Sequence, residues 1–372
     1  MVTNASTLVN FGATTQSVGD WMYSEYAMPS PGYLPLNSYT ASYLVSSYPA
    51  LGALIVPVIT PVSYVATART LPSSTLWIGL AYGNGTFVAT GGAPSSAAAT
   101  STNGTTWTSR TLPVSGSWFN VGYGNGTFVA INSNTAIAAT SPDGITWTQR
   151  TLPVSSSWFN VAYGNGTFVV VSETTGTIAA TSPDGITWTQ RTMPATAAWK
   201  NVTFGNGVFV AVASGSANAA YSYDGITWYL TAMPSSSNWR GLAYGNGIFV
   251  AVSQTSGTIA ASSPDGINWT ARTLPSASFW VAVAYGNNTF MAISGTSTTV
   301  AATSPDGITW TAQTMPTSSN WASITFGLGL FVAISQTTGT VAASIAYAVN
   351  ATSFVLPVVA PKAGTTAYVK AT

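Results

Sequence analysis

Seven copies of one sequence unit run through this chain, and each copy opens with a tryptophan. The opening residues are Trp77, Trp118, Trp158, Trp199, Trp239, Trp280 and Trp321, which lie 40 or 41 residues apart. A fixed period of about 40–45 residues, with four short strands in each unit, is typical of a β-propeller in which each unit forms one blade. The repeat therefore predicts an all-β fold, a seven-bladed β-propeller. It also directs the search for function to residues that depart from the repeat.

Each unit reads as four strands joined by tight turns. In the unit that opens at Trp158, the predicted strands are residues 158–163, 167–172, 177–182 and 186–192. The hairpin turn Gly164-Asn165-Gly166 follows the first strand, because asparagine and glycine accept positive φ angles. Apolar residues occupy both faces of the middle strands, as expected where each sheet is covered by neighbours on both sides.

A second turn precedes the fourth strand and is followed by a tryptophan; it reads Ser-Pro-Asp-Gly in most units and Ser-Tyr-Asp-Gly at Asp224. Its aspartates are Asp143, Asp184, Asp224, Asp265 and Asp306, and the first unit has Asn103 instead. An aspartate here can accept backbone N–H groups across its own turn, while the tryptophan packs between blades. The motif resembles the Asp-box of sialidase-like propellers, although the usual box has one more residue between Asp and Gly. We therefore predict a structural role for these aspartates. Because there is one in each blade, they are spread around the ring and are poor candidates for a catalytic pair of carboxylates.

Arginine also recurs once in most units. The repeated residues are Arg69, Arg110, Arg150, Arg191 and Arg272, interrupted by Thr231 and Gln313. From Arg110 on, the arginine follows the turn position by seven residues, which at about 3.4 Å per residue predicts that arginine and aspartate lie on opposite rims. The arginines could form a broken ring that attracts an anion. We favour the alternative that they protect an exposed outer strand from aggregation.

The two ends of the repeat predict how the ring closes. The seventh unit lacks its second turn and fourth strand, whereas residues Tyr64 to Pro72 match the fourth-strand pattern with no blade before them. We therefore expect an N-terminal strand to complete the last blade. This gives a propeller over residues 64–344 and a second module from residues 1–63 and 345–372.

The second module carries a different resemblance. The stretches Pro31–Leu34, Tyr48–Leu51 and Thr352–Pro357 are similar to the two halves of phage tail-collar and tail-fibre modules, although Pro35-Leu36-Asn37 replaces the usual polar Cys-Asp-Gly. The resemblance implies a small α+β collar-like module, built from both termini, that attaches the chain to a virion. The alternative is a generic small cap beside the propeller.

Composition excludes several classes of function. The chain has 9 basic and 8 acidic residues, a net charge of +1, and neither histidine nor cysteine. We therefore expect no nucleic-acid partner, no metal, no cofactor and no enzyme activity, because the usual phosphate-binding charge, acid–base groups and thiolates are missing. The amino terminus lacks the regions of a signal peptide, and no apolar run reaches the roughly 20 residues that cross a bilayer, so no membrane insertion is expected.

Sequence variation is concentrated in the loops that should emerge on one face of the ring. The candidate ligand-binding residues on this face are Phe119, Phe159, Glu173, Lys200 and Arg240, most of them directly after an opening tryptophan. Loops on a rigid scaffold are a common place for recognition, and aromatic rings beside small polar residues suit sugars. The alternative is that this face merely tolerates variation in length.

The sequence thus predicts a virion protein, most consistent with a tail fibre or tail-tip component that recognises a host-surface glycan. Its expected partners are other tail or capsid proteins, in a homo-oligomer or multi-copy assembly. A capsid decoration or cement protein is one alternative. A lectin or scaffold with an Asp-box, unrelated to phage, is the other.

Overall fold

The computed structural model describes residues 20–22, 33–35, 63–92 and 94–348. The chain divides into two compact units, Tyr64–Ala348 on the one hand and Met1–Ser63 with Val349–Thr372 on the other. In the second unit, β1 (Asp20–Met22) and β2 (Tyr33–Pro35) form an antiparallel pair. The described residues contain no helix, so the expected α+β character of the collar-like module is not seen. Its stretches Tyr48–Leu51 and Thr352–Pro357 lie outside the described residues.

The unit Tyr64–Ala348 consists of repeated four-stranded antiparallel blades, as in β-propellers. The innermost strands are β4 (Trp77–Gly83), β8 (Trp118–Gly124), β12 (Trp158–Gly164), the end of β15 (Thr189–Gly205), β19 (Trp239–Gly245), β23 (Trp280–Gly286) and β27 (Trp321–Gly327). The second strands are β5 (Thr86–Gly91), β9 (Thr127–Asn132), β13 (Thr167–Ser172), β16 (Val208–Ser214), β20 (Ile248–Ser253), β24 (Thr289–Ser294) and β28 (Leu330–Ser335).

The outer half of each blade follows the same order. The third strands are β6 (Ser95–Ser101), β10 (Thr135–Ser141), β14 (Gly176–Ser182), β17 (Ser216–Ser222), β21 (Gly257–Ser263), β25 (Thr298–Ser304) and β29 (Gly339–Ala348). The outermost strands are β7 (Thr108–Gly116), β11 (Thr148–Ser156), the start of β15, β18 (Tyr229–Ser237), β22 (Thr270–Ser278), β26 (Thr311–Ser319) and β3 (Ser63–Thr75). Two neighbouring blades share β15 as one continuous strand and so form a single seven-stranded sheet.

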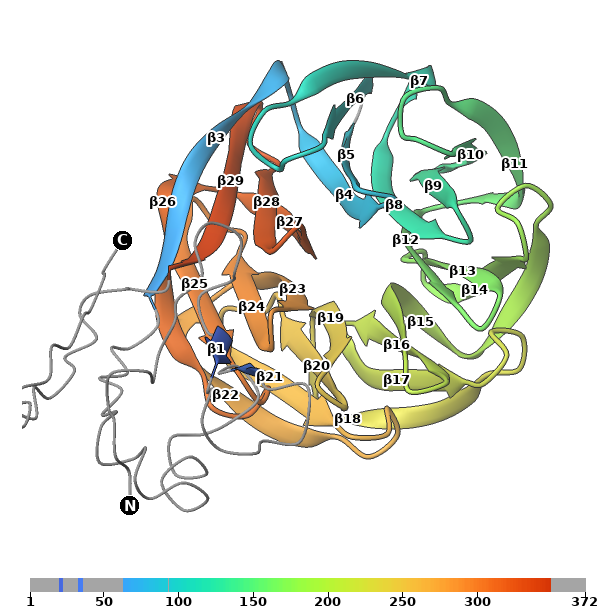
Figure 1. Cartoon of the computed structure of the whole chain (residues 1–372). Helices are drawn as coiled ribbons and strands as arrows, with labels where there is room; N and C mark the ends of the chain where they lie inside the picture. Colours follow the sequence, from blue (N-terminus) through green and yellow to red (C-terminus); the bar gives the residue numbers. More distant parts are fainter. Residues whose placement is uncertain (1–19, 23–32, 36–62, 93, 349–372) are drawn as a thin grey trace, which may run out of the picture. The chain divides into compact units, whose positions relative to one another are not determined.

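Strand β3 closes the ring, as the sequence predicts. It lies beside β29 at the outer edge of the last blade, where the blue strand runs along the red one in Figure 1. The Arg69 Nε donates a hydrogen bond of 2.8 Å to the Ser344 hydroxyl and links the two strands. Pairing with β3 gives the last blade a fourth strand from the other end of the repeat.

Small residues set the spacing between blades. The glycine that ends each innermost strand lies against an aromatic ring of the next blade, so that a Cβ at Gly164 would lie 2.0 Å from Cγ of Phe204. The last blade repeats this contact with the first, where a Cβ at Gly327 would lie 2.3 Å from Cγ of Tyr82. Each opening tryptophan is fully buried. The indole of Trp158, for example, donates its N–H to the Val154 carbonyl at 3.2 Å.

The last blade ends later than the sequence predicts. Strand β29 continues to Ala348 rather than stopping at Ser344, and Phe331 pairs with Ile345. In the blade before it, the equivalent Phe290 pairs with Ser304, which begins the Ser-Pro-Asp-Gly turn. Because that turn is missing after β29, nothing ends the strand at this point.

The fourth strand starts three residues later than predicted, at Thr189 instead of Ile186. The reason is the turn itself. The Asp184 Oδ1 accepts the N–H groups of Ile186 at 2.8 Å and Thr187 at 3.1 Å, and the Trp188 indole donates to the Gly185 carbonyl at 3.0 Å. These bonds hold residues 186–188 in the turn. The same carboxylate contacts recur at Asp143, Asp224, Asp265 and Asp306.

The prediction that arginine and aspartate mark opposite rims is wrong for the same reason. Because the turn takes up the residues before the strand, the arginine is only the third residue of the outermost strand, as Arg110 is in β7. Arg110 and Asp143 of the neighbouring blade line the same hollow. The Arg110 Nε donates to the Thr100 hydroxyl at 3.0 Å, so this arginine joins the two outer strands of its blade.

Candidate binding site at the centre of the ring

The residue after each opening tryptophan lies in a β-bulge. In β12, Trp158 pairs with Ser172 and Asn160 with Val171, which leaves Phe159 unpaired between them. The same shift leaves Lys200 unpaired in β15 and Arg240 in β19. A bulge re-aims a side chain without breaking the rest of the ladder. The bulged position is therefore where this repeat can vary its side chain most freely.

The structure brings the five predicted ligand-binding residues together. The rings of Phe119 and Phe159 lie 5.1 Å apart between centroids. The Lys200 Nζ lies 4.4 Å from the centroid of the Phe159 ring, and the Arg240 Cζ lies 5.7 Å from it. The Glu173 carboxylate, on the loop between β13 and β14, forms an ion pair with Lys200 at 2.6 Å. We call these residues the central cluster.

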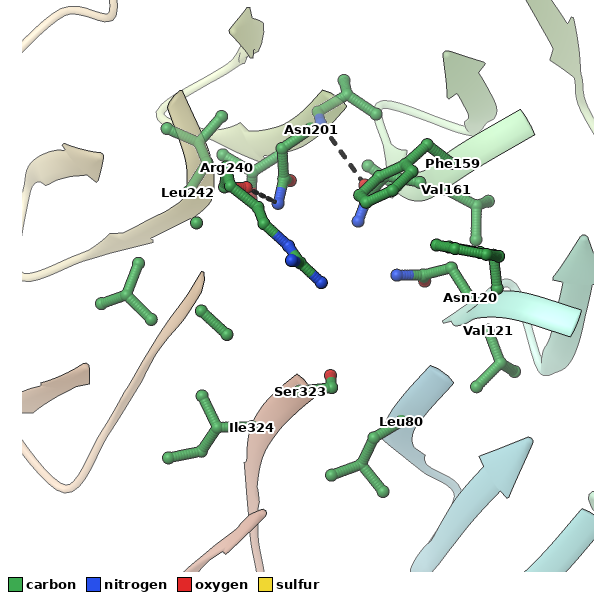
Figure 2. Close-up of a pocket in the computed structure, with 18 of the residues that line it drawn as sticks. Leu80, Asn120, Val121, Phe159, Val161, Asn201, Arg240, Leu242, Ser323 and Ile324 are labelled. Atoms are coloured by element: carbon green, nitrogen blue, oxygen red, sulfur yellow. Dashed lines mark hydrogen bonds between the residues drawn. The ribbon is translucent and has the colours of Figure 1, made fainter. Parts of the chain in front are cut away.

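Three residues of the central cluster, Phe119, Phe159 and Arg240, line a cavity of about 300 Å³ at the centre of the ring. Its walls come from all the innermost strands, from β4 round to β27. Figure 2 shows the Arg240 side chain extending into this space, with Asn120 and Ser323 on other sides of it. Leu80 and Ile324 supply part of an aliphatic wall. The cavity thus combines one guanidinium, neutral polar groups and apolar surface.

Two of the asparagines in the cavity wall have structural partners. The Asn160 Oδ1 accepts the N–H of Val202 at 3.3 Å, and the Asn201 Nδ2 donates to the Arg240 carbonyl at 2.7 Å. These bonds, dashed in Figure 2, join neighbouring innermost strands. For the Asn120 amide and the Ser323 hydroxyl, the described part of the chain supplies no hydrogen-bond partner. Both groups are therefore available to a ligand.

Arg240 is the unusual group of the site. The residue is only 8% exposed, yet its guanidinium has no hydrogen-bond acceptor among the described residues. Burial lowers the pKa of Arg240 to about 10, against the attraction of the Glu173 carboxylate, which raises it. The guanidinium therefore remains charged at neutral pH. A buried cation without a bonded anion is unfavourable for the folded chain by itself.

The aromatic rings differ in what they offer. Phe159 is 8% exposed and is covered by the two cations, whereas Phe119 is half-buried. Of these two rings, Phe119 therefore retains more surface for stacking. Phe279, directly before an opening tryptophan, is 38% exposed and was not singled out from the sequence. The sequence feature that could have identified Phe279 is its aromatic side chain, in a loop where the other units have small or polar residues.

The sequence also gave no prominence to Asn120, Asn160, Asn201 and Ser323. They occupy the second position after the opening tryptophan, where other units have glycine or alanine. An aromatic group on the outer strands was missed as well: Tyr221 stacks on Tyr229 at 5.3 Å between centroids, and Tyr229 is 48% exposed. For the tyrosines, the signal was a departure from the serine or threonine that the other units have at these positions.

Within the described residues, no group of three or more His, Cys, Asp or Glu side chains is arranged to hold a metal ion. No helix long and apolar enough to cross a membrane occurs in that part of the chain.

Comparison with known proteins identifies the fold. No protein-family model and no curated protein matches the chain. Among solved structures, it is similar to a catalytically inactive virginiamycin B lyase from Staphylococcus aureus with quinupristin, at 12% identity and a TM-score of 0.69, over 77% of this chain and 100% of that one. It is also similar to YCF48 bound to D1 peptide, at 17% identity and a TM-score of 0.61, over 76% and 97% of the two chains.

A third similar structure is the Pan2 WD40 domain of Neurospora crassa, at 8% identity and a TM-score of 0.54, over 73% of this chain and 89% of that one. The three proteins are a lyase, a protein bound to a peptide and a WD40 domain, and their sequence identity to this chain is low. The likeness therefore shows the fold and not the function. The chain is an all-β protein of repeated four-stranded blades, with the fold of β-propeller proteins.

Proposed function

We propose that this chain is a seven-bladed β-propeller that serves as a non-catalytic recognition subunit of a phage virion, in a tail fibre or at the tail tip. In this proposal, the central cluster and the cavity beside it bind a glycan on the host surface. The blade number is supported by the seven opening tryptophans and by the repeated contact between a terminal glycine and the next blade.

The central cluster is the observation that carries the binding role. Five residues come from four innermost strands and one loop and contact one another. Three of them, Phe119, Phe159 and Arg240, line one cavity. The other bulged positions hold the neutral side chains of Ile78, Val281 and Ala322. Packing alone does not require two cations at these positions, because the same backbone elsewhere accepts aliphatic residues. Binding of a ligand would explain why Lys200 and Arg240 occupy these positions.

The non-catalytic part of the proposal rests on chemistry. The chain has no histidine or cysteine and only two glutamates. Of these, Glu173 is paired with Lys200. The turn aspartates accept hydrogen bonds from their own backbone, which lowers the pKa of Asp143 below its usual value although burial acts against this. A carboxylate with a lowered pKa is a poor general acid near neutral pH.

The virion part of the proposal rests on the terminal stretches that resemble phage tail-collar and tail-fibre modules. A homo-oligomer or a multi-copy assembly with other tail or capsid proteins would fit that location. A capsid decoration or cement protein remains the first alternative, since the same terminal module could attach to a capsid. A lectin or scaffold unrelated to phage is the second. Immunolabelling of purified virions followed by electron microscopy separates these three, because it gives tail, capsid or no label.

Binding is tested with the labelled full-length chain on glycan arrays and on host cells. Phe119→Ile and Lys200→Ala place at the bulged position the residues that the chain itself has at Ile78 and Ala322, so the fold should be retained. We expect each substitution to weaken binding at least about tenfold, which corresponds to roughly 1.4 kcal/mol. Arg272→Gln, on the outer strand β22, is the control and should bind as the unchanged chain does. Equal binding by all variants, or no binding to any surface, would overturn the recognition role.

A further inference from the structure

We infer that the central cavity binds a carboxylate group and that Arg240 is its principal ligand. The inference deepens the proposed function, on which it depends for what carries the carboxylate: an acidic sugar of a surface glycan. It starts from the contrast between Arg240 and the other arginines. Each outer-strand arginine donates its Nε to a serine or threonine hydroxyl of its own blade, as Arg191 does to Thr181 at 2.8 Å. Arg240 has no such acceptor among the described residues.

Burial makes this contrast significant. The guanidinium can donate five N–H groups, and it extends into the cavity from a residue that is 8% exposed. Water inside a half-enclosed space satisfies such donors less well than an anion does, because a hydrogen bond between two charged partners is about twice as strong as a neutral one. The planar fork of N–H groups also matches the two oxygens of a carboxylate. The geometry thus selects a planar anion.

The charge of the surroundings favours a single negative charge. Lys200 and Arg240 contribute two positive charges and Glu173 one negative charge, so the central cluster has a net charge of +1. Because Lys200 is already paired with Glu173 at 2.6 Å, Arg240 is the cation left to bind a ligand. A carboxylate, with one charge, neutralises it. A phosphate dianion would leave an excess charge close to Glu173 and is therefore less favoured.

The rest of the cavity suits a polyol attached to the carboxylate. The Asn120 amide can both donate and accept, and the Ser323 hydroxyl can do the same. Both line the cavity with Arg240, on other sides of the space that its guanidinium enters. Leu80 and Ile324 contribute aliphatic surface, which fits the C–H faces of a sugar ring. A cavity of about 300 Å³ has room for one hexuronic acid residue.

The repeat offers a variant that tests the role of Arg240 directly. The bulged position that Arg240 occupies is filled by Val281 in the next blade, so Arg240→Val introduces a side chain that this backbone accepts. If Arg240 is kept for binding, its removal relieves an unpaired buried charge, and the melting temperature should stay the same or rise. If Arg240 is a structural residue, the melting temperature should fall. The matched control is Arg272→Gln, which removes one charge where the chain elsewhere has Gln313.

The experiment titrates the full-length chain with sodium glucuronate, sodium acetate, sodium phosphate and neutral glucose at constant ionic strength, and follows binding by calorimetry and melting temperature. We expect saturable binding of glucuronate and weaker binding of phosphate. Acetate lacks the polyol and glucose lacks the carboxylate, so each should bind at least about tenfold more weakly than glucuronate. Arg240→Val should abolish the glucuronate response, and Arg272→Gln should retain it. A crystal soaked in glucuronate should show its carboxylate on Arg240.

Several outcomes would overturn the inference. They are no saturable glucuronate binding, equal binding by Arg240→Val, tighter binding of phosphate than of glucuronate, or a melting temperature that Arg240→Val lowers. The proposed function fails separately. If the chain binds neutral glycans in a way that Arg240→Val does not change, recognition stands and the carboxylate site falls. If glucuronate binds through Arg240 but no glycan or host surface does, the site stands and the recognition role falls.

Discussion

A single carboxylate oxygen organises the second turn of most blades. In the turn after β21, Asp265 Oδ1 accepts the N–H groups of Ile267 at 2.9 Å and Asn268 at 2.8 Å. Burial raises the pKa of Asp265, but these N–H groups lower it more, and the net pKa is about 2. Asn103 makes the equivalent bonds in the first blade, with the N–H groups of Thr105 and Thr106 at 2.9 Å. The turn therefore forms without a charge, although the lowered pKa of Asp265 means that the ionised carboxylate is the favoured form in the folded chain.

The lowered pKa of Asp265 makes the stability of the fold depend on pH. Because the pKa of Asp265 is lowered from 3.8 to about 2 in the folded chain, its ionised form stabilises the fold above pH 3.8, and that contribution is lost as the pH falls through about 2. Asp265→Ala should lower the free energy of unfolding at pH 7 by about 1–2 kcal/mol, and by less at pH 2. Asp265→Asn keeps an acceptor oxygen and should lose less than Asp265→Ala at pH 7, and little at pH 2. Urea unfolding at both pH values measures this, and equal losses for Asn and Ala at pH 7 would contradict it.

At the scale of strands, the outer pair of most blades is joined by a side-chain hydrogen bond at one recurring position, whereas Thr231 at that position donates to the Ile267 carbonyl of the next blade. The Arg191 Nε donates to the Thr181 hydroxyl at 2.8 Å, and in another blade the Gln313 Nε2 donates to the Thr303 hydroxyl at 3.0 Å. The recurring arginine thus holds β14 to β15. The outermost strands also carry a proline, such as Pro153 in β11, which is tolerated there because the outer edge needs no N–H donor.

The prediction at this scale compares two substitutions of one arginine. Arg191→Gln should leave the free energy of unfolding nearly unchanged, since the Gln313 side chain already makes the equivalent bond. Arg191→Ala should lower it by about 1 kcal/mol, the typical contribution of one hydrogen bond. Thermal unfolding followed by calorimetry distinguishes the two. Equal losses from both would show that the arginine acts through its charge.

The elements show why the sequence predicted some features and missed others. Opening tryptophans, Asn-Gly hairpins and the order of strands follow local rules, so they were predicted correctly, as was β3 beside β29. The start of the fourth strand was missed because the hydrogen bonds of Asp184 draw Ile186 and Thr187 into the turn. That error also misplaced the arginines. The repeat pattern does not specify which side chains meet between blades. It therefore could not predict that the Arg240 guanidinium has no hydrogen-bond acceptor among the described residues.

For the ring as a whole, closure means that the contact between the last and first blades should contribute to stability as much as any other contact between blades. The contact between Gly327 and Tyr82 joins the last blade to the first, and the contact between Gly205 and Tyr244 joins two blades in the middle of the repeat. In an open array, the end contact would fray and contribute little. In a closed ring, breaking either contact strains the same cooperative unit.

Matched glycine substitutions test closure. A Cβ at Gly327 would lie 2.3 Å from Cγ of Tyr82, and one at Gly205 would lie 2.0 Å from Cγ of Tyr244. We expect Gly327→Ala and Gly205→Ala each to lower the free energy of unfolding by about 2–3 kcal/mol through overpacking. Gly329→Ala is the control: no atom lies within 4 Å and φ is +76°, so the loss should be about 1 kcal/mol. A loss for Gly327→Ala no larger than this control would mean that the seam is open.

The bulge after each opening tryptophan has a consequence for engineering. Its residue is skipped by the backbone ladder, so isoleucine, phenylalanine, lysine, arginine, valine and alanine all occupy that position in this one chain. The propeller backbone therefore accepts side chains of different size and charge at this position around the central cavity. Randomising these positions together offers a route to new specificities in which folding and selection for affinity remain largely separate problems.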